Sequence, residues 1–139
     1  MIDNLIRSQT KISVIITCYN YGHFLSEAIE SVLNQTFEAP EIIVVNDGST
    51  DNTAEIAARY PILIVNQNNQ GLPTARNVGI SKSNGIYILP LDADDKLHPQ
   101  YLEKVVPILD RHPDIGVVYT CRLHFGLLNT LKGKHGGRR

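Results

Sequence analysis

Gly85-Ile-Tyr-Ile-Leu-Pro-Leu-Asp-Ala-Asp-Asp95 joins an apolar run to three closely spaced carboxylates. The run predicts a buried β-strand, and Asp92, Asp94 and Asp95 stand at its end. Carboxylates this close repel one another and lose hydration where they pack against protein. A divalent metal that also binds phosphate would compensate their charge, since hard cations take carboxylate and phosphate oxygens. A solvated acidic turn that caps the next helix is the alternative, and the cluster alone does not decide between them.

Strand-like and helix-like segments alternate on both sides of this stretch. β-Branched apolar runs bounded by turn residues predict strands, and apolar residues at spacings of three and four predict amphipathic helices. The predicted strands are 12–16, 41–45, 62–65, the run that ends at 91, and 116–120; the predicted helices are 24–35, 53–60, 73–81 and 99–109. This alternation favours an α/β fold, with a mostly parallel sheet and helices on both faces. The sequence contains neither a G-x-G-x-x-G turn after the first strand nor a Walker A motif.

The composition of the 139 residues is that of one globular domain with a core. No apolar run has membrane-spanning length and no signal-peptide pattern is present, so we expect a cytoplasmic protein without a membrane segment. Cys18 and Cys121 lack zinc-type spacing and are interpreted as reduced thiols. All 14 acidic residues lie in residues 1–121, whereas residues 122–139 are basic. We therefore expect a domain at 1–121, a basic irregular tail at 122–139, and no nucleic-acid partner.

Polar side chains follow three of the predicted strands, at the point where each strand ends. They are Thr17, Tyr19 and Asn20 after the first strand, Asn46, Asp47 and Ser49 after the second, and Asp92, Asp94 and Asp95 after the fourth. The carboxyl ends of parallel strands meet at one edge of the sheet, which is where open α/β sheets bind ligands. The sequence therefore predicts a binding site at this edge.

Individual residues at this edge suit a nucleotide, but each has a plainer interpretation. Tyr19 offers a flat ring on which a nucleobase could stack. Asp47 could accept a hydrogen bond from the N–H of a uracil imide, yet an Asx-turn within Asn-Asp-Gly is favoured when Asp47 is considered alone. Arg76 could contact phosphate or order the carboxylates, or it could form a surface salt bridge.

Five segments together resemble a known family. They are Val14–Asn20, Ala28–Thr36, Ile43–Thr53, Asn69–Gly79 and Leu91–Asp95. In order and spacing they resemble the opening of the family 2 glycosyltransferases of the GT-A fold, a Rossmann-like fold, over roughly residues 11–121. The resemblance implies a nucleotide-sugar donor, with a UDP-sugar favoured, and Mn²⁺ or Mg²⁺ as cofactor. It also implies inverting transfer to an acceptor hydroxyl and a role in polysaccharide biosynthesis.

The resemblance assigns a role to each residue of the predicted site. Thr17 and Tyr19 would hold the base with Asn20 beside them, Asp47 would bond the uracil edge, Asp92 would contact ribose or donor sugar, Arg76 would help to hold the donor, and Asp94 and Asp95 would bind the metal, Asp94 more directly. The family's catalytic base lies well after the aspartate motif, so no residue of this chain is assigned to that role.

From this difference we expect a truncated protein whose donor-binding half is largely intact and whose acceptor half is incomplete. The alternative is a non-catalytic nucleotide-sugar-binding or assembly module. A glycan or lipid-linked acceptor would place the protein at the inner face of the membrane. Because an incomplete acceptor half leaves one sheet face under-covered, we also expect a homodimer or marginal stability.

Overall fold

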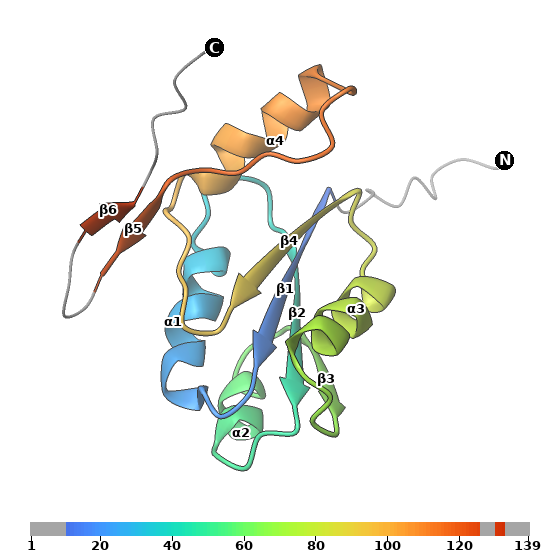
Figure 1. The fold of residues 1–139 in the computed structure, drawn as a ribbon, viewed down its shortest axis with the longest axis vertical. Helices are drawn as coiled ribbons and strands as arrows, with labels where there is room; N and C mark the ends of the chain where they lie inside the picture. Colours follow the sequence, from blue (N-terminus) through green and yellow to red (C-terminus); the bar gives the residue numbers. More distant parts are fainter. Residues whose placement is uncertain (1–10, 126–129, 133–139) are drawn as a thin grey trace, which may run out of the picture. The chain divides into compact units, whose positions relative to one another are not determined.

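The computed structural model describes residues 11–125 and 130–132. The chain forms two compact units, Met1–Glu103 and Lys104–Arg139, and each is described by itself. The first unit contains a four-stranded sheet and three complete helices (Figure 1). Its strands are β1 (Ile12–Cys18), β2 (Glu41–Asp47), β3 (Leu63–Gln67) and β4 (Tyr87–Asp92), and its complete helices are α1 (Gly22–Leu33), α2 (Thr53–Ala57) and α3 (Leu72–Lys82). Among the described residues, no helix has the length and apolar character needed to cross a membrane.

The strand order of this sheet is β3-β2-β1-β4, and all three pairings are parallel. From β1 the chain moves outward through β2 to β3, and α3 then carries it back to β4 on the other side of β1. The direction of winding therefore reverses between β1 and β4, which creates the crevice where open α/β sheets bind ligands. This topology confirms the predicted α/β fold.

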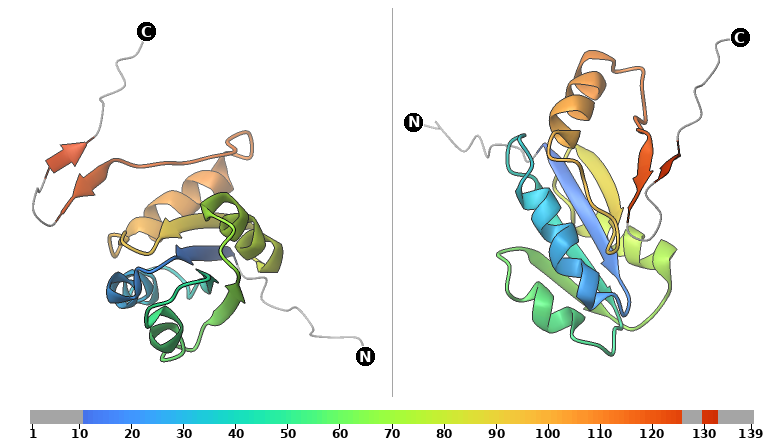
Figure 2. Two further views of the ribbon diagram at one scale, coloured as in Figure 1. Left: turned by 60° about the horizontal axis from the view of Figure 1, so that its bottom comes forward. Right: turned by 90° about the vertical axis from the view of Figure 1, so that its left-hand side faces the viewer.

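The two central strands are buried on both faces because helices cover both sides of the sheet (Figure 2). All seven residues of β1 are buried, and alternate side chains point to opposite faces. Val14 and Ile16 pack in one apolar cluster with Leu25 of α1, whereas Ile15 packs in a second cluster with Ala75 of α3. The continuous apolar runs that predicted these strands are therefore explained by burial on two sides.

Helix α3 lies unusually close to the sheet at Gly79. A Cβ atom built on Gly79 would come within 2.2 Å of Cγ2 of Ile15 and within 3.1 Å of Cγ2 of Val45. Atoms of real side chains do not approach so closely, so the absence of a side chain at this position sets the distance between α3 and the sheet. This close packing holds the amino end of α3 near the carboxyl end of β1.

A polar network joins the amino ends of β1 and β2 to the loop that enters β4. The Ser13 hydroxyl donates to the Glu41 carboxylate, and Asn84 donates to it through its backbone N–H and its side-chain amide, both at 2.8 Å. The Gly85 N–H donates to Oγ of Ser13 at 2.8 Å. Desolvation raises the pKa of Glu41, but the hydrogen bonds from Ser13 and Asn84 together outweigh it and hold that pKa below its usual value.

Strands β1, β2 and β3 end two residues later than the sequence predicts, and β4 ends one residue later. Strand β1 continues to Cys18 and β2 continues to Asp47, because Thr17 pairs with Val45 and Asp47 pairs with Gln67. Polar residues at strand ends resemble loop residues in a sequence, but here the parallel ladder includes them. As a result, the backbone of Thr17 and Asp47 is fixed by the sheet.

The second unit corrects two predictions about the end of the chain. Residues 116–120 form no strand, although the run Gly-Val-Val-Tyr-Thr has strand-like composition, because no neighbouring strand in the described part of the chain pairs with it. Strands β5 (Arg122–His124) and β6 (Thr130–Lys132) pair antiparallel, with Leu123 opposite Leu131, where an irregular tail is predicted. Three-residue strands are too short to produce a recognisable alternation. The remainder of the predicted tail, 126–129 and 133–139, lies outside the described residues.

Helix α4 (Tyr101–Arg111) begins in the first unit and ends in the second. The helix begins two residues after the predicted start at Pro99 and contains Pro107. Within the first unit, the Leu102 side chain is fully buried. The domain boundary at residue 121 stays a prediction.

Candidate functional site

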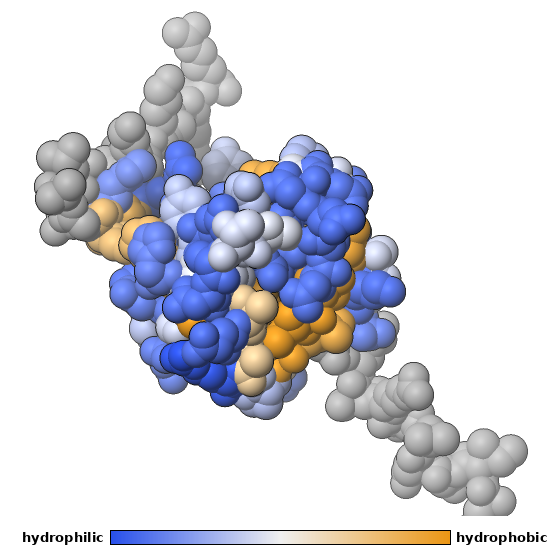
Figure 3. All heavy atoms as spheres, turned by 90° about the horizontal axis from the view of Figure 1, so that it is seen from below, coloured by the Kyte–Doolittle hydropathy of each residue, from blue (hydrophilic) through white to orange (hydrophobic). Residues whose placement is uncertain are grey.

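A cavity of about 480 Å³ opens at the carboxyl ends of the strands, at the reversal between β1 and β4. Its walls come from the end of β1 and the turn after it, the end of β2, the beginning of α3 and the turn after β4. The lining residues are Thr17, Cys18, Tyr19, Tyr21, Asp47, Asn69, Gly71, Leu72, Ala75, Asp92, Ala93 and Asp94. Figure 3 views the molecule from below Figure 1, the side toward which β1 and β2 point, and this side is mainly hydrophilic, with its most extensive hydrophobic area right of the centre of the view.

Thr17 and Asp92 line the cavity where β1 and β4 lie side by side. The two residues are partners in the parallel register of these strands. Thr17 is only 6% exposed, and its Oγ1 atom is buried with no hydrogen-bond partner among the described residues. A buried hydroxyl of this kind costs free energy unless a ligand or water pairs with it. Thr17 is therefore suited to contact a ligand in the cavity.

Asp47 is buried at the end of β2 and accepts three hydrogen bonds, one from the last residue of β3 and two from the segment that follows β3. Its Oδ1 accepts from Nε2 of Gln67 at 2.7 Å and from the Gln70 N–H at 2.9 Å, while Oδ2 accepts from the Gly71 N–H at 2.9 Å. A carboxylate offers about four acceptor positions, so one remains for a ligand. No Asx-turn bond from Asp47 is present among its described contacts; within Asn-Asp-Gly it is Asn46 that stabilises the turn, with its Oδ1 accepting from the Ser49 N–H at 3.0 Å.

Arg76 of α3 contacts the carboxylate of Asp92. Its Nη2 lies 2.7 Å from Oδ1 of Asp92, and the two side chains are 37% and 41% exposed. Nε of Arg76 is buried and has no hydrogen-bond partner among the described residues. Arg76 does not belong to the cavity lining, so it reaches the site through Asp92. This contact agrees with two of the alternatives weighed for Arg76, ordering a carboxylate and forming a surface salt bridge.

The turn after β1 presents Tyr19 to the cavity, and Asn20 stabilises that turn. Tyr19 is 48% exposed, whereas Asn20 adopts a positive φ of 56° and lies outside the cavity lining. The Asn20 N–H donates to Oγ of Ser49 at 3.0 Å, and Oδ1 of Asn20 accepts from the Thr50 N–H at 2.8 Å. Asn20, predicted as a ligand-binding residue, joins the turns after β1 and β2 in this structure.

Only part of the predicted acidic cluster lines the cavity. Asp92 and Asp94 belong to the lining, but Asp95 does not, and the Asp95 N–H donates to the carbonyl oxygen of Asp92 at 3.0 Å. Over the part of the chain that the structure describes, no group of three or more His, Cys, Asp or Glu side chains is arranged to hold a metal ion. Mg²⁺-type cations are often bound by one or two carboxylates together with phosphate oxygens of a substrate. The donor pair of Asp92 and Asp94 fits a cation shared in this way, and does not form an all-protein metal cage.

The segment between β3 and α3 forms a wall of the cavity that was not predicted from the sequence. Asn69 and Gly71 line the cavity, followed by Leu72 and Ala75 of α3. The segment packs so closely on the turn after β2 that a Cβ atom on Gly48 would come within 2.6 Å of the Asn69 nitrogen. Gly48 also has a positive φ of 77°, a conformation that favours glycine. The only sequence signal for this wall is that these residues fall within the Asn69–Gly79 motif.

Comparison with known proteins agrees with the geometry. The family described as "Glycosyl transferase family 2" matches residues 13–136. An uncharacterized glycosyltransferase of Escherichia coli, YibD, is 41% identical over 107 residues, which is 73% of this chain and 31% of the relative. The glycosyltransferase GlyA of Streptococcus pneumoniae is 38% identical over 113 residues, which is 77% of this chain and 16% of the relative. The chain thus spans about a third or less of the length of these relatives.

Solved structures that resemble this chain include complexes of TarS with UDP and with UDP-GlcNAc. The crystal structure of S. aureus TarS 1–349 in complex with UDP is 31% identical, has a TM-score of 0.69, and is matched over 74% of this chain and 33% of that one. The TarS structure in complex with UDP-GlcNAc matches equally well, with 31% identity and a TM-score of 0.69. On its sequence, its fold and the extent of the family match, this chain belongs to glycosyl transferase family 2 and has the Rossmann-like GT-A fold.

Proposed function

We propose that this chain binds the donor in a transferase that moves a sugar, with inversion, from a UDP-sugar to an acceptor hydroxyl, with a divalent cation. One observation carries the proposal: Thr17, Tyr19, Asp47, Asp92 and Asp94 come from three strand ends and line a single cavity at the reversal of the sheet. The similarity to TarS, whose structures contain UDP and UDP-GlcNAc, supports uridine as the base of the donor.

The base would be bound on the side of the cavity formed by β1 and β2. The half-exposed ring of Tyr19 offers a stacking surface for a pyrimidine. The remaining acceptor position of Asp47 suits the N3–H of uracil, which is a donor. The Thr17 hydroxyl, which has no hydrogen-bond partner within the described part of the chain, lines the same cavity and would gain a partner from the nucleoside.

The diphosphate would be bound at the end of β4. Asp94, predicted as the more direct metal ligand, would hold a divalent cation, which when bound neutralises the leaving nucleoside diphosphate. Asp92, for which the resemblance implies contact with ribose or donor sugar, lines the same cavity and is proposed here as the second carboxylate of the cation site. Arg76 would fix the orientation of Asp92 through their 2.7 Å contact. Asp95 stays a prediction as a second metal ligand.

In this proposal all three carboxylates that line the cavity belong to donor binding. Asp47 accepts from its own loop and the base, and Asp92 and Asp94 hold the cation. None of the three is left to deprotonate the acceptor hydroxyl. We therefore assign no residue of the cavity as the general base.

Titration of the 139-residue chain with UDP, with Mn²⁺ and with EDTA tests the proposal. We expect UDP to bind more tightly in Mn²⁺ than in EDTA, and we expect Asp94→Ala to remove that gain because the cation loses a carboxylate. The control is Glu55→Ala, which removes one negative charge from the exposed surface of α2, where Glu55 pairs with Arg59. If wild-type UDP affinity is the same in Mn²⁺ and in EDTA, the metal-dependent proposal is wrong.

A further inference from the structure

The turn that carries Asp94 lies between two fixed points of the first unit. On one side, Asp92 is held by the register between β4 and β1, opposite Thr17. On the other side, Lys96 and Leu97 are bonded to helix α1, and His98 is bonded to Gln35, which follows α1. The backbone path of the acidic turn, residues 92–95, therefore depends on the contacts that hold the segment after it. That segment is not part of the cavity lining.

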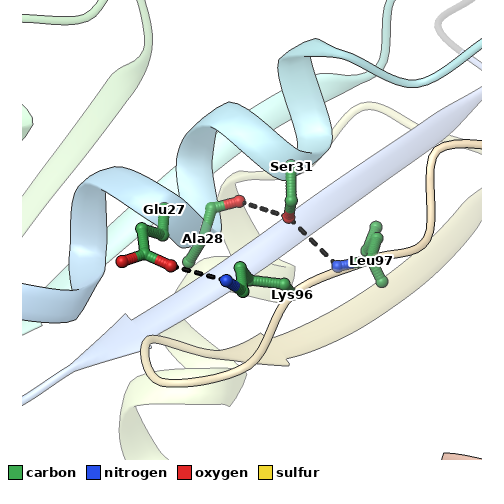
Figure 4. Close-up of polar contacts among 5 residues, drawn as sticks. All are labelled: Glu27, Ala28, Ser31, Lys96 and Leu97. Atoms are coloured by element: carbon green, nitrogen blue, oxygen red, sulfur yellow. Dashed lines mark hydrogen bonds and ion pairs between the residues drawn. The ribbon is translucent and has the colours of Figure 1, made fainter. Parts of the chain in front are cut away.

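Ser31 of α1 holds the backbone of this segment directly (Figure 4). Its hydroxyl donates to the Ala28 carbonyl oxygen at 2.7 Å and accepts from the Leu97 N–H at 3.1 Å. One turn of α1 earlier, Glu27 pairs with Lys96 at 2.6 Å. Half-exposed ion pairs of this kind contribute little, so the backbone contact made by Ser31 is the more specific constraint.

Gln35 continues the attachment beyond the end of α1. Its Nε2 donates to the Ser31 carbonyl oxygen at 3.0 Å and to the His98 carbonyl oxygen at 2.8 Å, while Oε1 accepts from the Leu102 N–H at 2.9 Å. Gln35 is 9% exposed, so these bonds are shielded from water. The nitrogen and the oxygen of this buried amide both bond main-chain groups, so Gln35 fixes the path of the backbone.

These contacts explain a motif that the donor site does not use. The segment Ala28–Thr36 belongs to the family resemblance, yet none of its residues lines the cavity. Ser31 and Gln35 instead bond residues 97–102, and Thr36 continues the series by donating its N–H to the Pro99 carbonyl oxygen at 3.0 Å. Three polar residues of the motif, Ser31, Gln35 and Thr36, thus act on the chain that leaves the acidic turn, whereas Glu30 accepts from the Tyr60 hydroxyl at 2.8 Å.

We propose that Ser31 and Gln35 are positioning residues for the acidic turn: they hold the segment after it, so that Asp94 faces the same cavity as Asp92. This inference rests on the proposed function, in which these two carboxylates hold the cation. Binding by two carboxylates and a diphosphate requires their oxygens to converge closely, because Mg²⁺-type cations tolerate little distortion. The base-binding wall, formed by β1 and β2, does not depend on these contacts.

The test compares UDP affinity in Mn²⁺ and in EDTA for wild type, Ser31→Ala and Gln35→Ala, by calorimetry on the 139-residue chain. We expect unchanged affinity in EDTA and a loss of about three- to ten-fold in Mn²⁺, the size expected for a lost hydrogen bond. A role in general stability alone would lower both affinities together. Urea unfolding of each variant establishes that it is folded under the assay conditions.

Ser81→Ala is the matched control. Ser81 of α3 makes the same helical contact, with its hydroxyl 2.7 Å from the Val78 carbonyl oxygen, but does not bond residues 96–99. We expect this variant to behave as wild type in both titrations. If wild type gains no affinity from Mn²⁺, the proposed function fails. If wild type gains affinity and Ser31→Ala gains as much, or if Ser31→Ala loses affinity equally in both conditions or unfolds, the positioning role is wrong.

Discussion

Asp47 combines two tasks within one buried carboxylate. Three of its acceptor positions bind Gln67, Gln70 and Gly71, which shapes the segment leading into α3. The fourth is available to a ligand in the cavity that Asp47 lines. Ligand affinity and the local fold therefore depend on the same side chain, and a substitution at this position should change both.

We predict that Asp47→Asn destabilises the chain by about 1–3 kcal/mol, because the amide places a donor against N–H groups that are already donors. UDP affinity in EDTA should fall as well, since the acceptor for the base is lost. Urea denaturation and calorimetry measure the two effects. Asp114→Asn makes the same chemical change at an exposed position and should leave both values unchanged. Wild-type stability in Asp47→Asn would contradict the three-donor arrangement.

At this scale the sequence predicted which residues gather, but not what each one contacts. Tyr19, Asp47 and Asp92 could be placed at one sheet edge because parallel strands end together. The donors to Asp47 stand 20 or more positions later in the chain, and no local pattern links them. Asn20 was predicted as a site residue because it is polar and follows a strand end. The same short amide side chain suits a turn, where it accepts a hydrogen bond from the backbone N–H of Thr50.

At the scale of elements, the packing of α3 on the sheet brings the Arg76 guanidinium to Asp92 and the first turn of α3 to the cavity. Gly79 sets this packing distance, because the sheet leaves no space for a side chain there. The helix itself was predictable from Pro73 and its boundaries, but the close approach was not. A glycine within a helix reads as a weak helix former unless the opposing strand is known.

We predict that Gly79→Ala destabilises the first unit by about 1–3 kcal/mol, since its methyl group would overlap the Ile15 side chain. The cost of this overlap should exceed the stabilisation of about 1 kcal/mol that replacing glycine by alanine normally brings to a helix. Gly116→Ala is the control, because a Cβ atom there meets nothing within 4 Å. Urea unfolding of the three chains measures the difference. Increased stability of Gly79→Ala would show that α3 is free to move away from the sheet.

At the scale of the whole molecule, the sequence predicted the first unit far better than the second. The two central strands, which helices bury on both faces, produce long apolar runs that were assigned correctly. The run that ends at residue 91 does form a strand, but its prediction as buried was wrong: β4 lies at one end of the strand order and is mostly half-buried or exposed. In the second unit, the run at 116–120 has the same composition but no strand partner among the described residues, so composition alone gave the wrong answer. Pairing, rather than propensity, decides whether such a segment becomes a strand.

The Glu41 network connects parts of the fold that are far apart in sequence, and its strength should depend on pH. Ser13, Glu41 and Asn84 join β1, β2 and the loop before β4, so losing the carboxylate charge weakens the closure of the sheet at its amino edge. The pKa of Glu41 is lowered in the folded state. Folding therefore gains stability above the pKa of unfolded Glu, about 4.3, and loses it as the pH falls through the lower folded value.

We predict that Glu41→Gln lowers the stability of the chain at pH 7 and that the difference from wild type shrinks as the pH falls below about 4.3. Urea unfolding at a series of pH values between neutral and acidic conditions measures this convergence. Glu38→Gln removes an exposed carboxylate a few residues earlier and should leave a curve parallel to that of wild type. A Glu41→Gln curve that also runs parallel to wild type across the acidic range would mean that the Glu41 carboxylate does not couple pH to closure of the sheet.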